Sequence, residues 1–469
     1  MSTSSSPNFD YDLVCIGSGP AGQRAAVQAA KLGEKAAVIE KRQVVGGACL
    51  GTGTIPSKTF REAVLAFSHG QSYLHEKELA QSRRPTANQL LSRVHEVIRM
   101  EGMVLEDQLS RNDVAMIRGD ASFLDPHTLH IVTDREEKCI TSDKILIAVG
   151  TVPTPPPGVP TDGTMVLNSD GIMMLDHLPK TMAVVGAGVI GIEYASMFAD
   201  LGVEVTVVDK RHRPLEFLDN EIVDELIHQM RNKNVLFRLT ETVAHLEISS
   251  GARKRAILQL ESGKRLVSDV VLYSVGRLGA TEALNLKAVG LEADGRGRLQ
   301  VNDQFQTSVP HIFAAGDVIG YPSLAATSSE QGRLAACYAF HVPVDLIDDH
   351  FPIGIYSIPE ISMVGKTEQD LTQSKVPYET GIARYREIAR GAIMGDNTGF
   401  FKMLFHRDTH CLLGVHAIGT GATELIHVGQ AVMGIEDGLG YFLKTVFNYP
   451  TLAECYKVAA LDAYNKLQH

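Results

Sequence analysis

One segment of the chain occurs twice, and this repeat constrains the fold more than any other feature. Residues 11–42 (YDLVCIGSGPAGQRAAVQAAKLGEKAAVIEKR) and residues 182–211 (MAVVGAGVIGIEYASMFADLGVEVTVVDKR) superpose at a constant offset of 169 positions. Each copy contains an apolar strand, a G-x-G-x-x-G turn, a helix of alanine and apolar residues, a second strand and an acid. The matching positions are Gly17 and Gly186, Gly19 and Gly188, Gly22 and Gly191, Gly33 and Gly202, and Glu40 and Asp209.

Each copy predicts a βαβ unit that binds the pyrophosphate of a dinucleotide. The first glycine makes a tight turn, the second lets the backbone approach the pyrophosphate, and the third lets helix and strand pack closely. The helix N-terminus presents free N–H groups and a positive dipole to the phosphates. The acid, which lies 23 positions after the first glycine in both copies, can accept hydrogen bonds from a ribose hydroxyl pair. We therefore predict two dinucleotide sites.

Length and patterning indicate further domains. At 469 residues the chain exceeds what one hydrophobic core supports, so two to four domains are expected. The proline-rich segment 151–163 is typical of a crossover between domains. Helical spacing of apolar residues predicts a long amphipathic helix over 88–111. After about residue 351, alternating strands followed by helices over 420–435 and 452–467 predict a separate α+β domain.

Composition excludes several classes of function. A net charge of −11 disfavours binding to nucleic acid or to an anionic membrane surface. The longest apolar stretch, residues 182–192, is broken by glycines and is too short to span a bilayer. Residues 1–8 read as a disordered tail without a secretion signal. The six cysteines are scattered without a C-x-x-C pair, and no H-E-x-x-H pattern occurs, so we expect no metal and a reducing cytoplasm.

Four further motifs resemble those of the pyridine nucleotide-disulfide oxidoreductases, the family of lipoamide dehydrogenase and glutathione reductase. Residues 46–58 (GGACLGTGTIPSK) resemble the active-site helix, and residues 145–151 (ILIAVGT) the end of the first FAD segment. Residues 307–317 (TSVPHIFAAGD) resemble the second flavin motif, whose aspartate holds the ribitol. Residues 449–454 (YPTLAE) stand where the family has H-P-T-x-x-E.

The resemblance implies an α/β fold with two Rossmann-like domains, in which an NAD(P) domain splits the FAD domain, and a C-terminal α+β dimerisation domain. It assigns the first repeat to FAD and the second to the nicotinamide dinucleotide. The expected boundaries are 9–155 and 279–350 for the two FAD segments, 156–278 for the NAD(P) domain and 351–469 for the dimerisation domain. A homodimer or a higher homo-oligomer is implied.

Two departures from the family pattern concern the redox-active disulfide. The family carries C-x4-C before I-P-S-K, whereas here Cys49 is followed by Thr54, which cannot form a disulfide. Tyr449 replaces the histidine base, and a tyrosine with a pKa near ~10 is a poor proton acceptor at neutral pH. These paired losses resemble a branch of the family, the soluble pyridine nucleotide transhydrogenases, which read C-x3-G-T-I-P-S-K in the same helix. Residues 316–325 (GDVIGYPSLA) also resemble that branch.

The resemblance implies an ion pair between Lys58 and Glu193 beside the flavin N5, on the nicotinamide side. A cation at this place favours the reduced, anionic flavin. Composition alone favours ordinary surface residues at both positions. Val189 occupies a position where some relatives have a tyrosine that covers the flavin, so a small side chain leaves the pocket open. Core packing of a valine at a helix start is nearly as good an explanation.

Residues near the end of the second repeat bear on the choice between NAD and NADP. Asp209 favours a free ribose 2′-hydroxyl, whereas Lys210, Arg211 and Arg213 could bind a 2′-phosphate. Basic residues also follow Glu40 in the FAD repeat, so only Arg213 is specific to the second copy. The sequence is compatible with use of both cofactors.

Cys49 could be a catalytic thiol, a redox-sensing thiol or a residue that packs beside the flavin. Packing is favoured, because reactivity needs a thiolate and the sequence indicates no base. Glu454 is expected to have a structural role in the C-terminal domain. The residues assigned to the FAD site are Gly17, Gly19, Pro20, Ala21, Gly22, Glu40, Lys41, Gly46, Gly47, Cys49, Lys58, Gly150, Asp317 and Ala325. Those assigned to the NAD(P) site are Gly186, Gly188, Val189, Ile190, Gly191, Glu193, Asp209, Lys210, Arg211, Arg213 and Gly276.

These features predict an FAD-dependent oxidoreductase that equilibrates NADPH and NAD⁺ with NADP⁺ and NADH by a ping-pong mechanism. One alternative is an NAD(P)H diaphorase or oxidase that passes electrons to quinones, dyes or oxygen. Another is a lipoamide dehydrogenase-like flavoprotein that has lost disulfide activity. A flavin-binding scaffold without catalysis is a third, and retention of Lys58, Glu193 and Asp317 argues against it.

Overall fold

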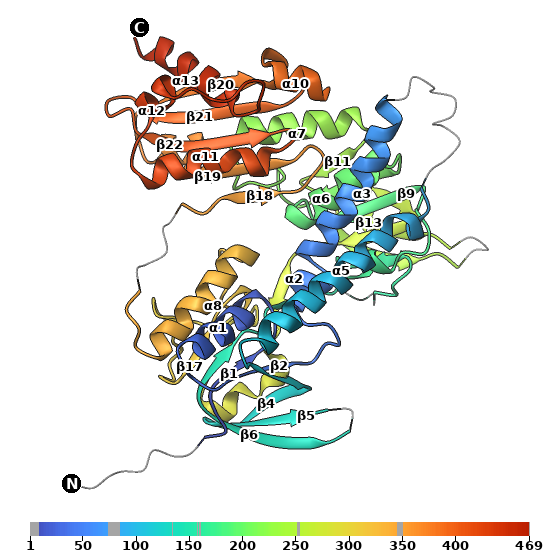
Figure 1. The fold of residues 1–469 in the computed structure, drawn as a ribbon. Helices are drawn as coiled ribbons and strands as arrows, with labels where there is room; N and C mark the ends of the chain where they lie inside the picture. Colours follow the sequence, from blue (N-terminus) through green and yellow to red (C-terminus); the bar gives the residue numbers. More distant parts are fainter. Residues whose placement is uncertain are drawn as a thin grey trace.

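The computed structural model describes residues 9–73, 85–133, 135–156, 158, 161–250, 254–344 and 350–468, with only the backbone at 69–73. The expected tail over 1–8 and three positions of the proline-rich segment lie outside these residues. Strands and helices alternate through the two glycine repeats, and the part of the chain after residue 350 forms a separate layer at one end (Figure 1). No helix among the described residues is long and apolar enough to cross a bilayer.

The first sheet contains the first repeat. Its strand order is β3-β2-β1-β6-β5-β4, and β17 also pairs with β6. The parallel neighbours of β1 are β2 and β6, whereas β6 pairs antiparallel with β5 through its first half. The strand bounds are β1 Tyr11–Ile16, β2 Ala36–Glu40, β3 Ala115–Arg118, β4 Asp120–Asp125, β5 Thr128–Val132, β6 Glu137–Ile147 and β17 Ile312–Ala314.

Two helices that are far apart in the sequence pack together beside this sheet. They are α1 (Pro20–Lys31) and α8 (Ala325–Ala339) (Figure 1). A Cβ atom at Gly332 of α8 would lie 2.0 Å from the carbonyl oxygen of Ala21, so only glycine permits this approach. The return of the chain through β17 and α8 therefore completes the structure that the first repeat begins.

The second sheet contains the second repeat, in the strand order β11-β10-β9-β15-β8. The parallel neighbours of β9 are β10 and β15, and a three-stranded sheet of β12, β13 and β14 adjoins it. The helices are α6 (Val189–Asp200) and α7 (Asn220–Asn232). The strand bounds are β8 Val166–Leu167, β9 Thr181–Val185, β10 Glu204–Asp209, β11 Leu236–Leu239, β12 Val243–Ile248, β13 Ala256–Leu260, β14 Arg265–Ser268 and β15 Val270–Tyr273.

The chain passes between the first two sheets twice, and the two crossing segments pair with each other. They are β7 (Thr151–Pro153) and β16 (Arg277–Gly279), which run antiparallel. Two long helices, α3 (Thr54–Tyr73) and α5 (Ala87–Ser110), also extend from the first sheet toward the second (Figure 1). The helix predicted over 88–111 is thus confirmed as α5.

The C-terminal sheet is antiparallel, in the order β18-β19-β22-β21-β20. The helices predicted over 420–435 and 452–467 correspond to α11 (Ala422–Gly434) and α13 (Glu454–Leu467), which cover it. The strand bounds are β18 Ile353–Ile355, β19 Ile361–Gly365, β20 Tyr378–Arg384, β21 Phe400–His406 and β22 Leu412–Ile418. Three short helices complete this part: α9 Glu368–Gln373, α10 Ala389–Met394 and α12 Leu439–Lys444.

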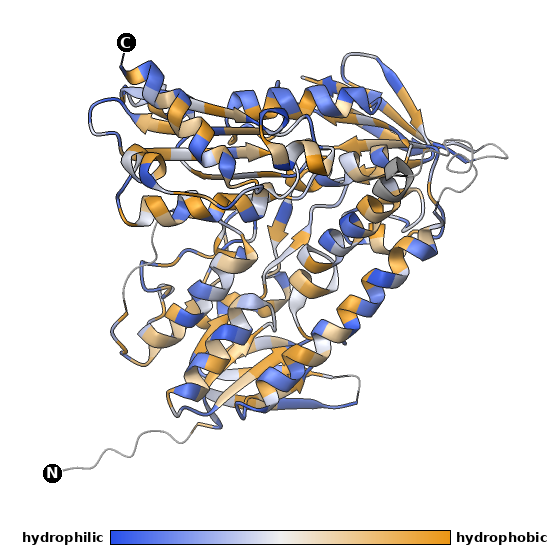
Figure 2. Cartoon of the chain, turned by 45° about the horizontal axis from the view of Figure 1, so that its top comes forward, coloured by the Kyte–Doolittle hydropathy of each residue, from blue (hydrophilic) through white to orange (hydrophobic). Residues whose placement is uncertain are grey.

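One continuous apolar core joins α3, α5, the second sheet and the nearer edge of the C-terminal sheet. Phe60 of α3 and Phe198 of α6 contact each other in it, with ring centroids 5.8 Å apart, and Ile361 of β19 belongs to the same cluster. The strands are mostly apolar, whereas the surface helices combine apolar and polar residues (Figure 2). The position of α3 is therefore fixed by packing against the second sheet and the C-terminal sheet, which matters because α3 begins in the active-site motif.

Candidate active site

The first glycine turn leaves open space above the N-terminus of α1. A Cβ atom at Gly17, where φ is +106°, would lie 2.4 Å from the Ala148 carbonyl oxygen, and one at Gly22 would lie 1.9 Å from the Gly17 carbonyl oxygen. A Cβ atom at Gly19 would meet no other atom within 4 Å. Pro20 begins the helix. Two glycines thus permit close packing and the third faces free space, which fits a bound pyrophosphate.

The second glycine turn repeats this geometry. A Cβ atom at Gly186 would lie 2.5 Å from the Ser274 carbonyl oxygen, and one at Gly191 would lie 1.9 Å from the Gly186 carbonyl oxygen. At Gly188 the nearest atom would be Nη2 of Arg211, at 3.9 Å. Both repeats therefore have the shape that a dinucleotide requires. The next two residues, Val189 and Ile190, are half-buried and pack against the core.

The acid of each repeat turns toward its own glycine turn. Glu40 accepts hydrogen bonds from the N–H and the hydroxyl of Ser18, at 3.0 and 2.5 Å, and from the N–H of Arg42 at 2.8 Å. Asp209 accepts one from the N–H of Ala187 at 2.5 Å and one from the N–H of Arg211 at 2.8 Å. Lys41 lies exposed beside the first acid.

Arg211 forms a bidentate ion pair with Asp209. Its Nε and Nη2 atoms lie 2.9 and 2.6 Å from the two carboxylate oxygens. Burial raises the pKa of the Asp209 carboxyl, but the hydrogen bonds from Arg211 outweigh this effect and hold the pKa below its ordinary value. Arg213 instead binds Asp224 at 2.6 Å, and Lys210 is exposed. Of the three basic residues, Arg211 is therefore the one placed at the glycine turn.

The active-site motif lies against the first glycine turn. Its short helix, α2 (Gly47–Gly51), begins where a Cβ atom at Gly47 would lie 2.9 Å from the Cα atom of Gly19. The N–H of Gly46 donates to the Ser18 hydroxyl at 2.9 Å. The hydroxyl oxygen of Thr52 is buried and has no hydrogen-bond partner in the described structure. An unpaired polar atom at the C-terminal end of α2 is a further feature that fits a bound polar group.

Cys49 lies on α2 and is half-buried. Burial raises the pKa of its thiol, and a hydrogen bond from Thr54 together with the charge of Lys58 only partly offsets this effect. The thiol is therefore protonated at neutral pH, and a protonated thiol is a poor nucleophile. Thr54, where the family has its second cysteine, begins α3.

Lys58 of α3 and Glu193 of α6, the helix of the second repeat, form an ion pair. The Nζ atom lies 2.8 Å from each carboxylate oxygen. Glu193 is 4% exposed and Lys58 is 25% exposed, so the carboxylate is fixed inside while the ammonium reaches the surface of the site. The predicted pair is thus present as a contact.

Asp317 lies at the second flavin motif and is poorly satisfied. Burial raises the pKa of its carboxyl, against the opposing charge of Arg277. The Thr151 hydroxyl donates to it at 3.5 Å, the limit of a hydrogen bond. A half-buried acceptor of this kind fits the hydroxyl groups of a ribitol chain. Gly150 and Gly276, on the two crossing segments, have φ angles of +65° and +133°, and Ala325 begins α8 beside this region.

Tyr449 is not brought to the pair of Lys58 and Glu193 within the chain: it is 69% exposed on the segment before α13. Glu454 begins α13, and one of its oxygens is buried without a hydrogen-bond partner among the described residues.

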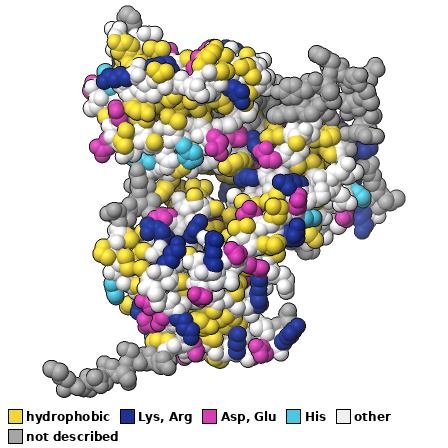
Figure 3. Space-filling model, in the orientation of Figure 1, with side chains coloured by type: hydrophobic (Ala, Val, Ile, Leu, Met, Phe, Trp, Pro, Cys, Tyr) yellow, Lys and Arg dark blue, Asp and Glu magenta, His cyan; other side chains and the backbone are white. Residues whose placement is uncertain are grey.

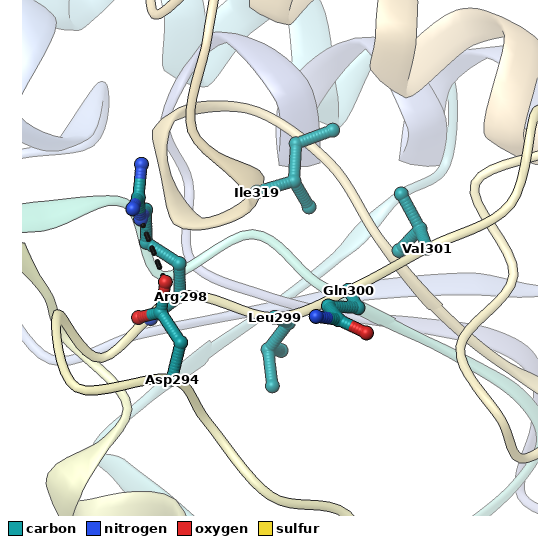
Figure 4. Close-up of a pocket in the computed structure, with 6 residues that line it drawn as sticks. All are labelled: Asp294, Arg298, Leu299, Gln300, Val301 and Ile319. Atoms are coloured by element: carbon teal, nitrogen blue, oxygen red, sulfur yellow. Dashed lines mark hydrogen bonds and ion pairs between the residues drawn. The ribbon is translucent and has the colours of Figure 1, made fainter.

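Two other groups of charged residues lie together but are paired within the protein. An open pocket of about 340 Å³ beside Ile319 is bordered by Asp294 and Arg298, which bind each other at 3.1 Å (Figure 4). Its two charged groups thus pair with each other. Elsewhere, the carboxylates of Asp219, Glu221 and Glu368 converge, but the Nζ atom of Lys402 occupies the space between them.

Sequence reasoning missed the segment Tyr356–Glu360, which connects β18 with β19 and contacts the Lys58–Glu193 pair. The only local signal is a Tyr-Ser-Ile-Pro-Glu turn between two apolar strands.

Figure 3 shows that the molecule is hollowed between the C-terminal sheet and the first sheet, with lysine and arginine side chains gathered below the hollow.

The fold and this site define an oxidoreductase with two dinucleotide-binding units, between which Lys58 and Glu193 form an ion pair. The chain belongs to the pyridine nucleotide-disulphide oxidoreductase family, whose profile matches residues 11–332, and the profile of the family's dimerisation domain matches residues 351–460. The predicted family and fold class are thereby confirmed, as are FAD as cofactor and the nicotinamide dinucleotides as substrates.

Several known proteins are similar over the full chain. A soluble pyridine nucleotide transhydrogenase of Mycobacterium tuberculosis is 52% identical over 463 residues and covers 98% of each chain. That of Photobacterium profundum is 45% identical and covers 97% of this chain and 98% of its own. Among solved structures, LpdA of Mycobacterium tuberculosis is 26% identical with a TM-score of 0.88, and covers 96% of this chain and 99% of its own. The HOCl-induced flavoprotein disulfide reductase RclA of Escherichia coli has a TM-score of 0.86 at the same identity and coverage.

Proposed function

We propose that this chain is a pyridine nucleotide transhydrogenase that equilibrates NADPH and NAD⁺ with NADP⁺ and NADH without a redox-active disulfide. The proposal rests on the residues at the two redox positions of the motif, where Cys49 is followed by Thr54 in place of a second cysteine. Cys49 is half-buried with a raised thiol pKa, and Thr54 has no sulfur, so the motif offers electrons no disulfide to enter. The names of the relatives that are 45–52% identical support the same activity.

Bound FAD would supply the capacity to take up a hydride from one nicotinamide and give it to another. The chain supplies position and charge. The two glycine turns hold the two pyrophosphates, and Asp317 holds the ribitol. Lys58, fixed by Glu193, places a cation on the nicotinamide side, where negative charge develops. Val189 leaves room for one nicotinamide to depart and a second to enter, so the kinetics are ping-pong.

The Asp209–Arg211 pair gives one pocket the means to bind both cofactors. Asp209 accepts hydrogen bonds from ribose hydroxyls, and Arg211 can bind a 2′-phosphate. We further propose that the two FAD segments are 9–155 and 279–350, that 156–278 binds NAD(P), and that 351–469 mediates a homodimer. All six cysteines are free, which supports a cytoplasmic location.

Stopped-flow spectroscopy tests the proposal. The flavin is reduced with one equivalent of NADPH and then mixed with NAD⁺, with oxygen, or with a quinone. We expect re-oxidation by NAD⁺ to be at least tenfold faster than by oxygen, and no turnover with lipoamide or glutathione disulfide. Faster re-oxidation by oxygen or quinone would instead identify an oxidase or diaphorase.

A further inference from the structure

The segment Tyr356–Glu360 belongs to the C-terminal part of the chain but is anchored to the helices that carry the catalytic pair. We refer to it as the 356–360 loop. Its first N–H, that of Tyr356, donates to Oε1 of Glu193 at 2.9 Å. Two residues on, the N–H of Ile358 donates to the hydroxyl of Ser196 at 2.9 Å. Both acceptors lie on α6, so the loop follows one face of that helix.

The same loop is fixed to α3 by Arg61. The Nε atom of this arginine donates to the carbonyl oxygen of Ser357 at 3.1 Å, and its guanidinium pairs with Glu360 at 3.0 Å. Both side chains of the ion pair are 7% exposed. The other oxygen of Glu360 accepts hydrogen bonds from the N–H and hydroxyl of Thr423, both at 2.7 Å. The loop thus joins α3, α6 and α11 through buried polar contacts.

Tyr356 completes the surroundings of the Lys58 ammonium. The Nζ atom lies 4.8 Å from the centroid of the Tyr356 ring, within the range of a cation–π contact. The ring packs close to Gly354, where a Cβ atom would lie 2.9 Å from the Thr423 side chain and 3.3 Å from the Tyr356 ring. The ammonium is therefore held by two carboxylate oxygens and one aromatic face.

Each of these constraints restricts a different motion of the lysine side chain. Glu193 alone attracts the ammonium but leaves it free to move about the carboxylate, since Lys58 is a flexible chain that is 25% exposed. The ring of Tyr356 removes part of that freedom. At the same time its backbone N–H holds the carboxylate that attracts the lysine.

We propose that Tyr356 is a positioning residue for the transhydrogenase reaction: its aromatic face fixes the Lys58 ammonium beside the flavin, and its backbone N–H fixes Glu193. The inference rests on the proposed function, in which Lys58 acts on the nicotinamide side of the flavin. The geometry of the reaction centre then depends on the C-terminal part of the chain, because that part supplies the 356–360 loop.

The test compares Tyr356→Leu with Tyr356→Phe in the FAD-loaded dimer. Leucine removes the aromatic face, whereas phenylalanine keeps it. We expect Tyr356→Leu to lower the limiting rate of flavin reduction by NADH about threefold to tenfold, with an unchanged KM. Tyr356→Phe should stay within about twofold of the parent on the same scale. Equal losses in both variants would overturn the role of the ring.

A double-substitution cycle separates positioning from mere packing. In a Lys58→Met background, Tyr356→Leu should have no further effect on the rate, because the group it positions is gone. An undiminished effect in that background overturns the inference. If Lys58→Met itself leaves flavin reduction unchanged, the proposed role of Lys58 fails instead, so the two failures are distinguishable.

The reduction potential of the bound flavin gives a measurement independent of turnover. Tyr356→Leu should lower the equilibrium constant for flavin reduction about threefold to tenfold, which is about 15–30 mV for a two-electron couple. Should Tyr356→Leu not fold, a series of mono-, di- and trifluorophenylalanine at this position replaces it, because ring fluorines weaken the aromatic face at nearly constant size. The potential should fall with each added fluorine. A flat series contradicts the proposal.

Discussion

Replacing Arg211 should separate the two nicotinamide cofactors. Its guanidinium lies nearest to the free space above Gly188, and it is held in a bidentate pair by Asp209. A 2′-phosphate offers the same planar pair of acceptors with more charge. Arg211→Ala should therefore weaken binding of NADPH and leave NADH nearly unaffected, because the freed carboxylate still accepts hydrogen bonds from ribose hydroxyls.

The expected size of the effect follows from the exposure of the pair. Charge-assisted hydrogen bonds contribute about 1.5–3 kcal/mol when shielded from solvent. The Arg211 side chain is 34% exposed, so solvent weakens its interaction with the phosphate. Binding the phosphate also weakens its ion pair with Asp209. The net contribution of Arg211 to the free energy of NADPH binding is therefore about 1.5 kcal/mol. The KM for NADPH should then rise about tenfold. Since the reaction centre lies away from the adenosine ribose, kcat at saturation should hold.

Two further variants make the experiment decisive. Arg213→Ala removes an arginine that binds Asp224 at 2.6 Å, and it should change the NADPH to NADH ratio much less. Asp209→Asn should raise the KM for NADH and spare NADPH. Steady-state kinetics of both cofactors with one fixed acceptor gives all the ratios. If Arg211→Ala leaves the ratio unmoved, even combined with Arg213→Ala, the dual-specificity reasoning is refuted and an NAD-linked diaphorase becomes the better assignment.

Further variants test the remaining assignments. Cys49→Ser should keep most of the NADPH-to-NAD⁺ rate, and a large loss would show that the thiol is catalytic. Gly19→Val should fold but purify without yellow FAD, because the added side chain enters open space rather than protein. Asp317→Leu should lose FAD as well, and normal absorbance in both variants would mean that the flavin site is misassigned. Lys402→Met should lower the free energy of unfolding by about 3–5 kcal/mol, because it leaves a buried carboxylate unpaired. Lys466→Met, which removes an exposed ion pair, should change this free energy little. Calorimetry measures both.

The parts of the fold predicted from the sequence are those that local chemistry determines. The glycines of the two repeats were identified because each turn requires a specific backbone shape within a few residues. The helix predicted over 88–111 matches α5, Ala87–Ser110, because its apolar residues follow one helical period. In both cases the pattern and the structure that it encodes occupy the same short segment.

The contacts between distant segments had weaker signals. Lys58 and Glu193 were paired only through resemblance, since nothing in either helix indicates the other. Tyr356 was missed for the same reason: its contact to Lys58 depends on how the C-terminal sheet meets α3. Lys402 is visible in the sequence as a lysine inside the apolar run of β21, Phe400–His406. The sequence does not indicate which acidic residues it pairs with.

Those partners show how the parts of the chain are held together. Lys402 of β21 is fully buried and binds Asp219, the N-cap residue of α7, at 3.0 Å. It also binds Glu368 of α9. Burial lowers the pKa of Lys402, but the carboxylates outweigh this and raise it, so the lysine stays charged. A charged group is buried only where its partners are already in place. The ion pairs of Lys402 and the contacts of the 356–360 loop therefore require the C-terminal sheet to pack in one position. In that position Tyr356 contacts Lys58.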